Sequence, residues 1–505
     1  MDPYVYEGLV ERLEAQSYRS PSAFRGKVIL ISSAAYMALF AVLLGLALLL
    51  YFGIQVAQEN HRSIGLIRLA ILSVMLLPLF FVVLRMFSLR LEPPKGHEIQ
   101  RADAPKLFEL LDQMRKKLKG PKIHHVLIDR EYNAAIAQLP KFGLFGDHTN
   151  YLVLGLPYLM AAPPKEMLAT IAHEYGHLCG GHGQLSARVY RQRKVFGALH
   201  EQVNAAADSS FINAGMASAL NRFMPYYNAY TFVLSRQDEY EADRTASDLV
   251  GASANASGLI RDTLLGSWIR QEFWPRLFKQ ADMHAQPLFL PYTQMRSALN
   301  DSYDEWATSD RLRVAWQQKS DLHDTHPSMR DRVEATGKNY KLPSQVEVAA
   351  AEGMLGPLVV QLAEKFDLEW WEEERKTWET RNRYAQRSIA RLHELCSLPL
   401  SSLKLQDLQE RALLTAEFES PKAAKPILEH LLRQTGGPFP KAAYFYGRIL
   451  LGENHDAGLD QLEAAAKNDR SLIEPAASAG YAYLLERQGE QAAQLWWAKV
   501  MPEQK

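Results

Sequence analysis

Two histidines and a glutamate lie within five residues in the segment His173-Glu174-Tyr175-Gly176-His177. On a helix, side chains four residues apart lie on the same face, about 40° apart around the axis. Both imidazoles can therefore bind one zinc ion. Glu174 lies beside them, where it can act as a general base on a water that the ion activates. The spacing predicts a metal-dependent hydrolytic site.

A second acidic segment, residues 236–244, follows about sixty residues later and is also typical of a helix. A catalytic zinc ion needs three protein ligands and an open position for water, and Glu239 is the predicted third ligand. Asp243, one helical turn further on, can accept a hydrogen bond from the outer nitrogen of a ligand histidine. Glu241 is an alternative ligand, but on a helix it points about 160° away from Asp243.

The elements that position this motif have local signals. Pro163-Pro164 predicts the start of the motif's helix, and Glu166 suits the positive end of the helix dipole. Gly180-Gly181 predicts the end of the helix. Strand-like runs at residues 124–128 and 151–156 predict a small sheet ahead of the helix.

Composition limits the possible functions of the chain. Its 505 residues contain 57 Lys and Arg against 57 Asp and Glu, so the net charge is zero and no basic field for nucleic acid is expected. The hydrophobic fraction of 47% can supply a real core. Two cysteines, Cys179 and Cys396, are too few for a disulfide scaffold or an all-cysteine zinc site.

Two apolar segments near the N-terminus are predicted to cross a membrane. Residues 28–54 carry no charge, and residues 64–87 carry arginines only near the two ends. A signal peptide is the alternative for the first segment, and a buried helix of a soluble domain is the alternative for the second. Lys and Arg are concentrated outside the connecting loop. Both termini and the domain after the second span are therefore expected in the cytoplasm.

The C-terminal region has a 34-residue pattern of small and large residues. This pattern is similar to that of tetratricopeptide repeats, in which a small residue lets paired helices approach closely. A second position, twelve residues earlier in each repeat, is small at Ala412 and Gly480 but is a large residue at Tyr446. The alternative to repeats is an ordinary helical bundle. The pattern consists of Ala424, Gly458 and Ala492 as small residues and Leu428, Leu462 and Trp496 as large ones.

The HEYGH segment followed by EYEAD resembles the HtpX and CaaX prenyl-endopeptidase family of membrane-bound gluzincin zinc proteases, over residues 64–333. His326-Pro327 resembles the family's His-Pro motif, with Ser328 in place of the usual second proline, and Arg332 follows His326 by six residues. A further segment resembles the family's Asn-Ala-Phe-Ala edge strand, with isoleucine where phenylalanine is usual. This segment consists of Asn133, Ala134, Ala135, Ile136 and Ala137.

The resemblance implies one catalytic Zn²⁺ bound by His173, His177 and Glu239, with Glu174 as general base. It also implies His326 and Arg332 as donors to the developing oxyanion, and a peptide extended along residues 133–137. The expected partners are a protein or peptide substrate, the lipid bilayer and a protein bound to the C-terminal repeats. The expected location is the inner or cytoplasmic membrane, with a role in clearing misfolded or membrane proteins.

Two rival functions remain. The chain could be a repeat-bearing adaptor or holdase with latent protease activity. It could also be a CaaX-type processing protease, although the resembling proteins use a large chamber of many spans, and two spans are too few for one.

The expected fold is mainly α (α+β), with two transmembrane helices, a gluzincin-type protease domain containing a small sheet, and helical repeats. The expected domains are a tail at 1–27, a membrane hairpin at 28–87, the protease domain at 88–345, a helical connector at 346–396 and repeats at 397–505.

Overall fold

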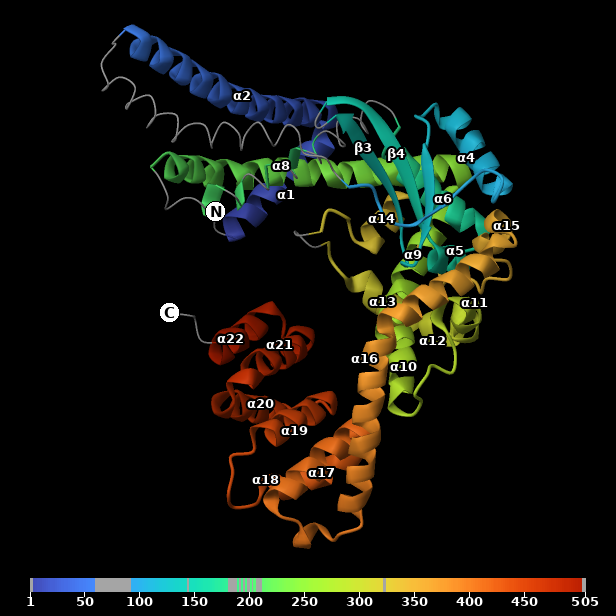
Figure 1. The fold of residues 1–505 in the computed structure, drawn as a ribbon, viewed down its shortest axis with the longest axis vertical. Coiled ribbons are helices and arrows are strands. Elements are labelled where there is room, and N and C mark those ends of the chain that lie inside the picture. The colour runs from blue at the N-terminus through green and yellow to red at the C-terminus, as the bar shows by residue number, and fades with distance from the viewer. Residues whose placement is uncertain are drawn as a thin grey trace. The chain divides into compact units, whose positions relative to one another are not determined.

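The computed structural model describes residues 3–59, 92–142, 145–179, 211–320 and 324–501, and scattered positions between 189 and 205. The chain divides into two compact units (Figure 1). The first comprises Met1–Arg276 and Phe289–Glu372, and the second comprises Leu277–Leu288 and Glu373–Lys505.

A four-stranded sheet lies in the first unit. Its strand order is β1-β2-β4-β3, with β2 parallel to β4 and the other pairs antiparallel. The strands are β1 (His97–Ile99), β2 (His125–Asp129), β3 (Ala134–Phe142) and β4 (Phe145–Gly155). The two strand-like runs predicted from the sequence are confirmed as β2 and part of β4. Strand β3 carries four of the five residues predicted to bind substrate, and it forms an outer edge of the sheet.

The helix of the HEYGH segment is α6 (Pro164–Gly176), which begins at the predicted proline. It ends at Gly176, with His177 as its C-cap, earlier than predicted from Gly180-Gly181. That glycine pair lies outside the described residues. The end of α6 is in tight contact with α8, because a Cβ on Gly176 would lie 3.2 Å from Cα of Ala242.

The acidic segment lies on α8 (Phe211–Val250), a helix of 40 residues against which α6 packs (Figure 1). Helix α9 (Ala252–Trp268) packs against both α6 and α8. Helices α1 (Pro3–Arg19) and α2 (Pro21–Glu59) also contact α8.

Two ion pairs join α8 to these N-terminal helices. Arg236 of α8 donates a hydrogen bond of 2.6 Å to Glu14 of α1, and Arg25 of α2 pairs with Glu241. Glu241, the alternative metal ligand, is therefore paired with an arginine.

The remaining helices of the first unit surround this core. They are α4 (Pro105–Leu118), α5 (Leu156–Ala161), α11 (Pro291–Asp301), α12 (Tyr303–Trp306), α13 (Ser309–Gln317), α14 (Met329–Ala335) and α15 (Ala350–Leu355). A π-helical turn, Ile269–Phe273, joins α9 to α10 (Trp274–Lys279), and α16 (Leu358–Cys396) passes from the first unit into the second.

The second unit contains three successive helix pairs. These are α17 (Leu405–Phe418) with α18 (Pro421–Leu432), α19 (Pro440–Gly452) with α20 (Ala457–Asn468), and α21 (Ile473–Gln488) with α22 (Glu490–Val500). Small residues lie where the helices approach: a Cβ on Gly458 would lie 2.5 Å from the carbonyl oxygen of Gly447. Gly447, next to Tyr446, is therefore the small residue of α19. Membership of the tetratricopeptide class stays a prediction.

Among the helices that the structure describes, none is both long and apolar enough to cross a bilayer. The first predicted span, residues 28–54, falls within α2. The second, residues 64–87, lies outside the described residues.

Candidate metal centre

Three of the predicted ligands converge at one point. One donor atom from each of His173, His177 and Glu239 lies within 4.8 Å of the other two. The Nε2 atoms of His173 and His177 are 3.3 Å apart, and the two rings are nearly perpendicular, at 89°. The carboxylate of Glu239 lies 3.5 Å from Nε2 of His173 and 3.4 Å from Nε2 of His177. The three side chains therefore face a common centre, although two come from α6 and its C-cap and one from α8.

The protonation of these groups without metal follows from their surroundings. Burial and the Arg332 guanidinium lower the pKa of His173, but contacts with Asp243 and Glu239 outweigh them and raise it to about 9. Burial and the charge on His173 lower the pKa of His177 to about 4. Burial raises the pKa of Glu239, but His173 and Arg332 outweigh it and lower the value to about 2. A cation binding here therefore replaces a proton on His173 and meets a charged carboxylate.

The types of donor atom at this centre, imidazole nitrogen and carboxylate oxygen, are also those that zinc prefers. Two imidazoles and one carboxylate are the ligands of many catalytic zinc sites, which keep a fourth position open. Oε2 of Glu239 is buried and has no hydrogen-bond partner among the described residues. A buried acceptor without a partner is costly unless something binds it. A zinc ion at this centre would satisfy that oxygen.

Asp243 and Arg332 both contact His173, and Nη2 of Arg332 lies 3.2 Å from its Nδ1. Oδ1 of Asp243 lies 2.9 Å from Nδ1 of His173, so the other ring nitrogen is left to face the centre. Arg332 of α14 binds the same carboxylate through two hydrogen bonds of 2.8 Å. Burial raises the pKa of Asp243, but Arg332 and His173 outweigh it and lower the pKa well below its usual value. Asp243 is therefore ionised at every physiological pH.

Glu174 lies between the metal centre and the sheet edge. Its Oε2 accepts a hydrogen bond of 3.2 Å from the backbone N–H of Ile136, on strand β3. Burial raises the pKa of Glu174 above its usual value, against the opposing charge of His173. A carboxylate with a raised pKa is a stronger base, so this environment suits proton transfer near neutral pH.

The loop before β3 is fixed by a close backbone approach. A Cβ on Gly155 would lie 1.7 Å from the carbonyl oxygen of Glu131, so only glycine fits there. The N–H of Gly155 donates a hydrogen bond of 2.8 Å to the carbonyl oxygen of Asn133. The side chain of Asn133 accepts a hydrogen bond from the N–H of Ala134 and lines the cavity beside the metal centre.

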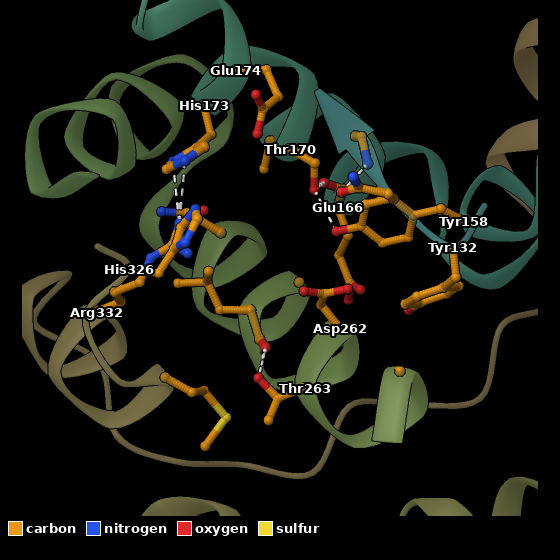
Figure 2. A pocket seen from close by; sticks show the side chains of 18 of the residues that line it. Tyr132, Tyr158, Glu166, Thr170, His173, Glu174, Asp262, Thr263, His326 and Arg332 are labelled. Carbon is orange, nitrogen blue, oxygen red and sulfur yellow. Dashed lines mark hydrogen bonds between the residues drawn. The ribbon is translucent and has the colours of Figure 1, made fainter. Parts of the chain in front are cut away.

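His326 lies on the open side of the centre. Its side chain is 60% exposed, and its Nε2 is 3.7 Å from Oε1 of Glu239. Nδ1 of His326 lies 3.0 Å from Asp324, which orients the ring. Figure 2 shows His326 beside Arg332, whose guanidinium lies 3.2 Å from Nδ1 of His173. His326 lines the cavity.

A cavity of about 430 Å³ extends from the metal centre along α6. Part of it is lined by residues for which the sequence contained no motif. Asp262 lies on α9 and becomes part of the cavity only because α9 packs against α6. The other residues without a motif include Tyr132, Tyr158, Thr170, Thr263 and Arg270.

Comparison with known protein families gives a direct match for this region. Residues 146–339 match Peptidase family M48. The matched segment contains the HEYGH helix, the whole of α8 and α9, and the His326–Arg332 segment. No curated protein matches the chain. Residues 146–339 are therefore similar to peptidase family M48, whose members are metallopeptidases.

Proposed function

We propose that this chain is a zinc-dependent endopeptidase in which His173, His177 and Glu239 bind one zinc ion. The observation that carries the proposal is the convergence of these three donors within 4.8 Å, with Glu174 next to His173 on α6. When bound, zinc supplies a Lewis acid that lowers the pKa of a coordinated water and polarises the scissile carbonyl.

Glu174 acts as the general base. Its raised pKa lets it take a proton from the attacking water and later return that proton to the leaving amine. His326 donates to the charge that develops on the carbonyl oxygen, because its ring reaches the open side of the centre. Arg332 contributes chiefly by holding Asp243 against His173.

The substrate lies extended along β3. This strand is an outer edge of the sheet, so backbone groups on its free side can pair with a peptide. The N–H of Ile136 points away from β4 to Glu174. A substrate carbonyl can replace Glu174 as the acceptor of this hydrogen bond and so release the base for catalysis.

Membrane attachment is a further part of the proposal. The 27 residues of segment 28–54 carry no charge. Several apolar side chains of α2 face outward, among them Met37 at 71% exposure and Phe40 at 63%. Burying such side chains in lipid is favourable, and this supports membrane attachment of the protease. A role in protein quality control is proposed with it.

The test is cleavage of an unfolded protein such as casein by the purified full-length chain. We expect cleavage that stops when a chelator removes the metal and resumes when zinc is added. Glu174→Gln should retain zinc and lose cleavage by at least about a thousandfold, because the amide cannot accept the proton. Bound zinc without chelator-sensitive cleavage would instead favour the adaptor or holdase. Wild-type cleavage rates in Glu174→Gln would refute the assignment of the base.

A further inference from the structure

The cavity beside the metal centre contains a carboxylate that the proposed reaction does not use. Asp262 is open to the cavity and forms no hydrogen bond or ion pair with any residue that the structure describes. Figure 2 shows it next to Tyr132 and Tyr158, away from His173 and His326. The cavity therefore contains an acidic group that lies apart from the candidate metal centre.

The other acidic groups of the cavity already have partners. Glu166 accepts a hydrogen bond of 2.6 Å from the buried Arg261 and another of 2.6 Å from Ser257. Asp324 accepts from His326. Only Asp262 thus remains, among the described acidic residues of the cavity, as an ionisable acceptor for a ligand outside the catalytic centre.

The cations near Asp262 are mostly engaged elsewhere. The charges acting on Asp262 come from Arg332, Arg270 and His326. Arg332 is bound by Asp243, and His326 by Asp324. Arg270 lies on the π-helical turn after α9 and lines the same cavity, but it forms no ion pair with Asp262. Of these three cations, Arg270 is therefore the one that no described acidic group binds and that can compete for the carboxylate.

The hydroxyl of Tyr132 adds a second unused polar group. It is buried and has no hydrogen-bond partner among the described residues, and its ring packs on Tyr158 at 4.9 Å. The hydroxyl of Tyr158 is within 3.1 Å of Thr170, which is one turn before Glu174 on α6. Aromatic faces with a carboxylate beside them suit the long stem and charged end of a basic side chain.

The direction of the substrate follows from the chemistry of Glu174. This residue must return its proton to the leaving amine, so the residue after the scissile bond lies on the Glu174 side of the centre. The cavity extends on this side, past Thr170 towards Asp262. The side chain of that residue is therefore the one that can enter the cavity.

We propose that Asp262 makes this cavity a specificity pocket for a lysine or arginine immediately after the scissile bond. The inference rests on the proposed endopeptidase function. A single charge pair in a partly open cavity gives a modest preference, of about tenfold over a neutral side chain of similar length.

The experiment compares two peptides that differ only in lysine or norleucine after the scissile bond, mapped by mass spectrometry. Wild type should prefer the lysine peptide in kcat/KM by about tenfold, and Asp262→Asn should cleave both equally. Arg270→Gln should increase the preference, because it removes the competing cation. Asp310→Asn, whose aspartate is 87% exposed on α13, is the control and should leave the preference unchanged.

A binding measurement separates this proposal from the proposed function. Fluorescence anisotropy of the same peptides on zinc-loaded Glu174→Gln should show tighter binding of the lysine peptide, lost in the double variant with Asp262→Asn. If wild type cleaves neither peptide, the endopeptidase assignment fails, and the binding comparison still tests the pocket. Equal preference, or equal affinity, with and without Asp262 would overturn the pocket.

Discussion

At the scale of single residues, the metal centre is organised by paired charges. His173 lies between Glu239 and Asp243, and Arg332 neutralises Asp243 from behind. Each buried charge thereby has a partner of opposite sign, which offsets the cost of removing it from water. Asp262, by contrast, has no such partner, and the crowding of protein atoms around it raises its pKa to about 6.

This raised pKa predicts how stability depends on pH. Between the unfolded value of about 4 and the folded value of about 6, the folded state binds more protons at Asp262, so stability falls as pH rises. Asp262→Asn removes this loss. The variant should therefore melt at a higher temperature than wild type at pH 7.5, with the difference disappearing at pH 4 or below. A lower melting temperature of Asp262→Asn at pH 7.5 would show that the carboxylate has a stabilising cation partner.

The sequence was sufficient to predict the three side chains that converge at the candidate metal centre, but not the cavity. His173, Glu174 and His177 are recognisable because helical spacing alone brings them together. Glu239 was predicted because it lies in an acidic segment, residues 236–244, that is also typical of a helix. Asp262 has no neighbour in sequence that marks it, because its environment is made by α6 and by the residues before β3.

At the scale of the elements, the site depends on the close approach of α6 and α8. Gly176 meets the backbone of Ala242, and Thr245 lies beside it. Glu239 comes from the turn of α8 before Ala242, so the distance between the helices sets the distance between Glu239 and the histidines.

Gly176→Ala tests this dependence. Its Cβ would lie 3.2 Å from Cα of Ala242 and 3.3 Å from Cβ of Thr245, and the first of these atoms belongs to a helix backbone that cannot move alone. We expect a loss of about 1–3 kcal/mol in stability and weaker zinc binding, despite the usual preference of helices for alanine. Thermal unfolding and competition with a chelator measure the two effects.

Gly353→Ala on α15 is the matched control. Its Cβ would have one neighbour, 3.7 Å away, which is an ordinary contact. That substitution should leave zinc binding unchanged and stabilise the protein by up to about 1 kcal/mol. Equal behaviour of the two variants would mean that the contact at Gly176 does not determine the geometry of the site.

The elements themselves were predictable to different degrees. Pro164 marks the start of α6 through its own backbone, and the runs in β2 and β4 are dense in branched residues, so local signals were enough. The end of α6 was predicted too late, at Gly180-Gly181. Its actual end at Gly176 coincides with the contact with α8, and a contact between helices is not encoded locally.

At the scale of the whole molecule, the chain consists of two compact units, and the continuous helix α16 contains one of the points at which the chain passes between them. No composition change marks the boundary inside this helix, which the sequence indicated only as part of a connector at 346–396. The helix pairs explain the large residues of the 34-residue pattern. Leu428, Leu462 and Trp496 each lie on the second helix of a pair, and all three are buried in the second unit.

Gly480→Val tests whether the second unit is independent of the metal centre. A Cβ on Gly480 would lie 2.2 Å from Nε1 of Trp496, which donates a hydrogen bond of 3.1 Å to the carbonyl oxygen of Ala477. Displacing this indole should destabilise the second unit by about 3 kcal/mol. We expect a new unfolding transition at lower temperature, seen by tryptophan fluorescence, with zinc affinity unchanged.

Gly452→Ala is the control for that experiment, because no atom lies within 4 Å of a Cβ at this position. It should behave like wild type. A parallel loss of zinc affinity in Gly480→Val would contradict the independence of the two units.

The most direct test of the whole account is the zinc content of the purified full-length chain, measured by atomic emission for wild type, Glu239→Gln and Glu174→Gln at one chelator concentration. We expect about one zinc ion per chain in wild type and in Glu174→Gln, because Glu174 is the base and not a ligand. Glu239→Gln should retain far less, with its folding checked by circular dichroism. Zinc contents that are equal in wild type and Glu239→Gln, or the absence of bound zinc from the wild type, would contradict the account.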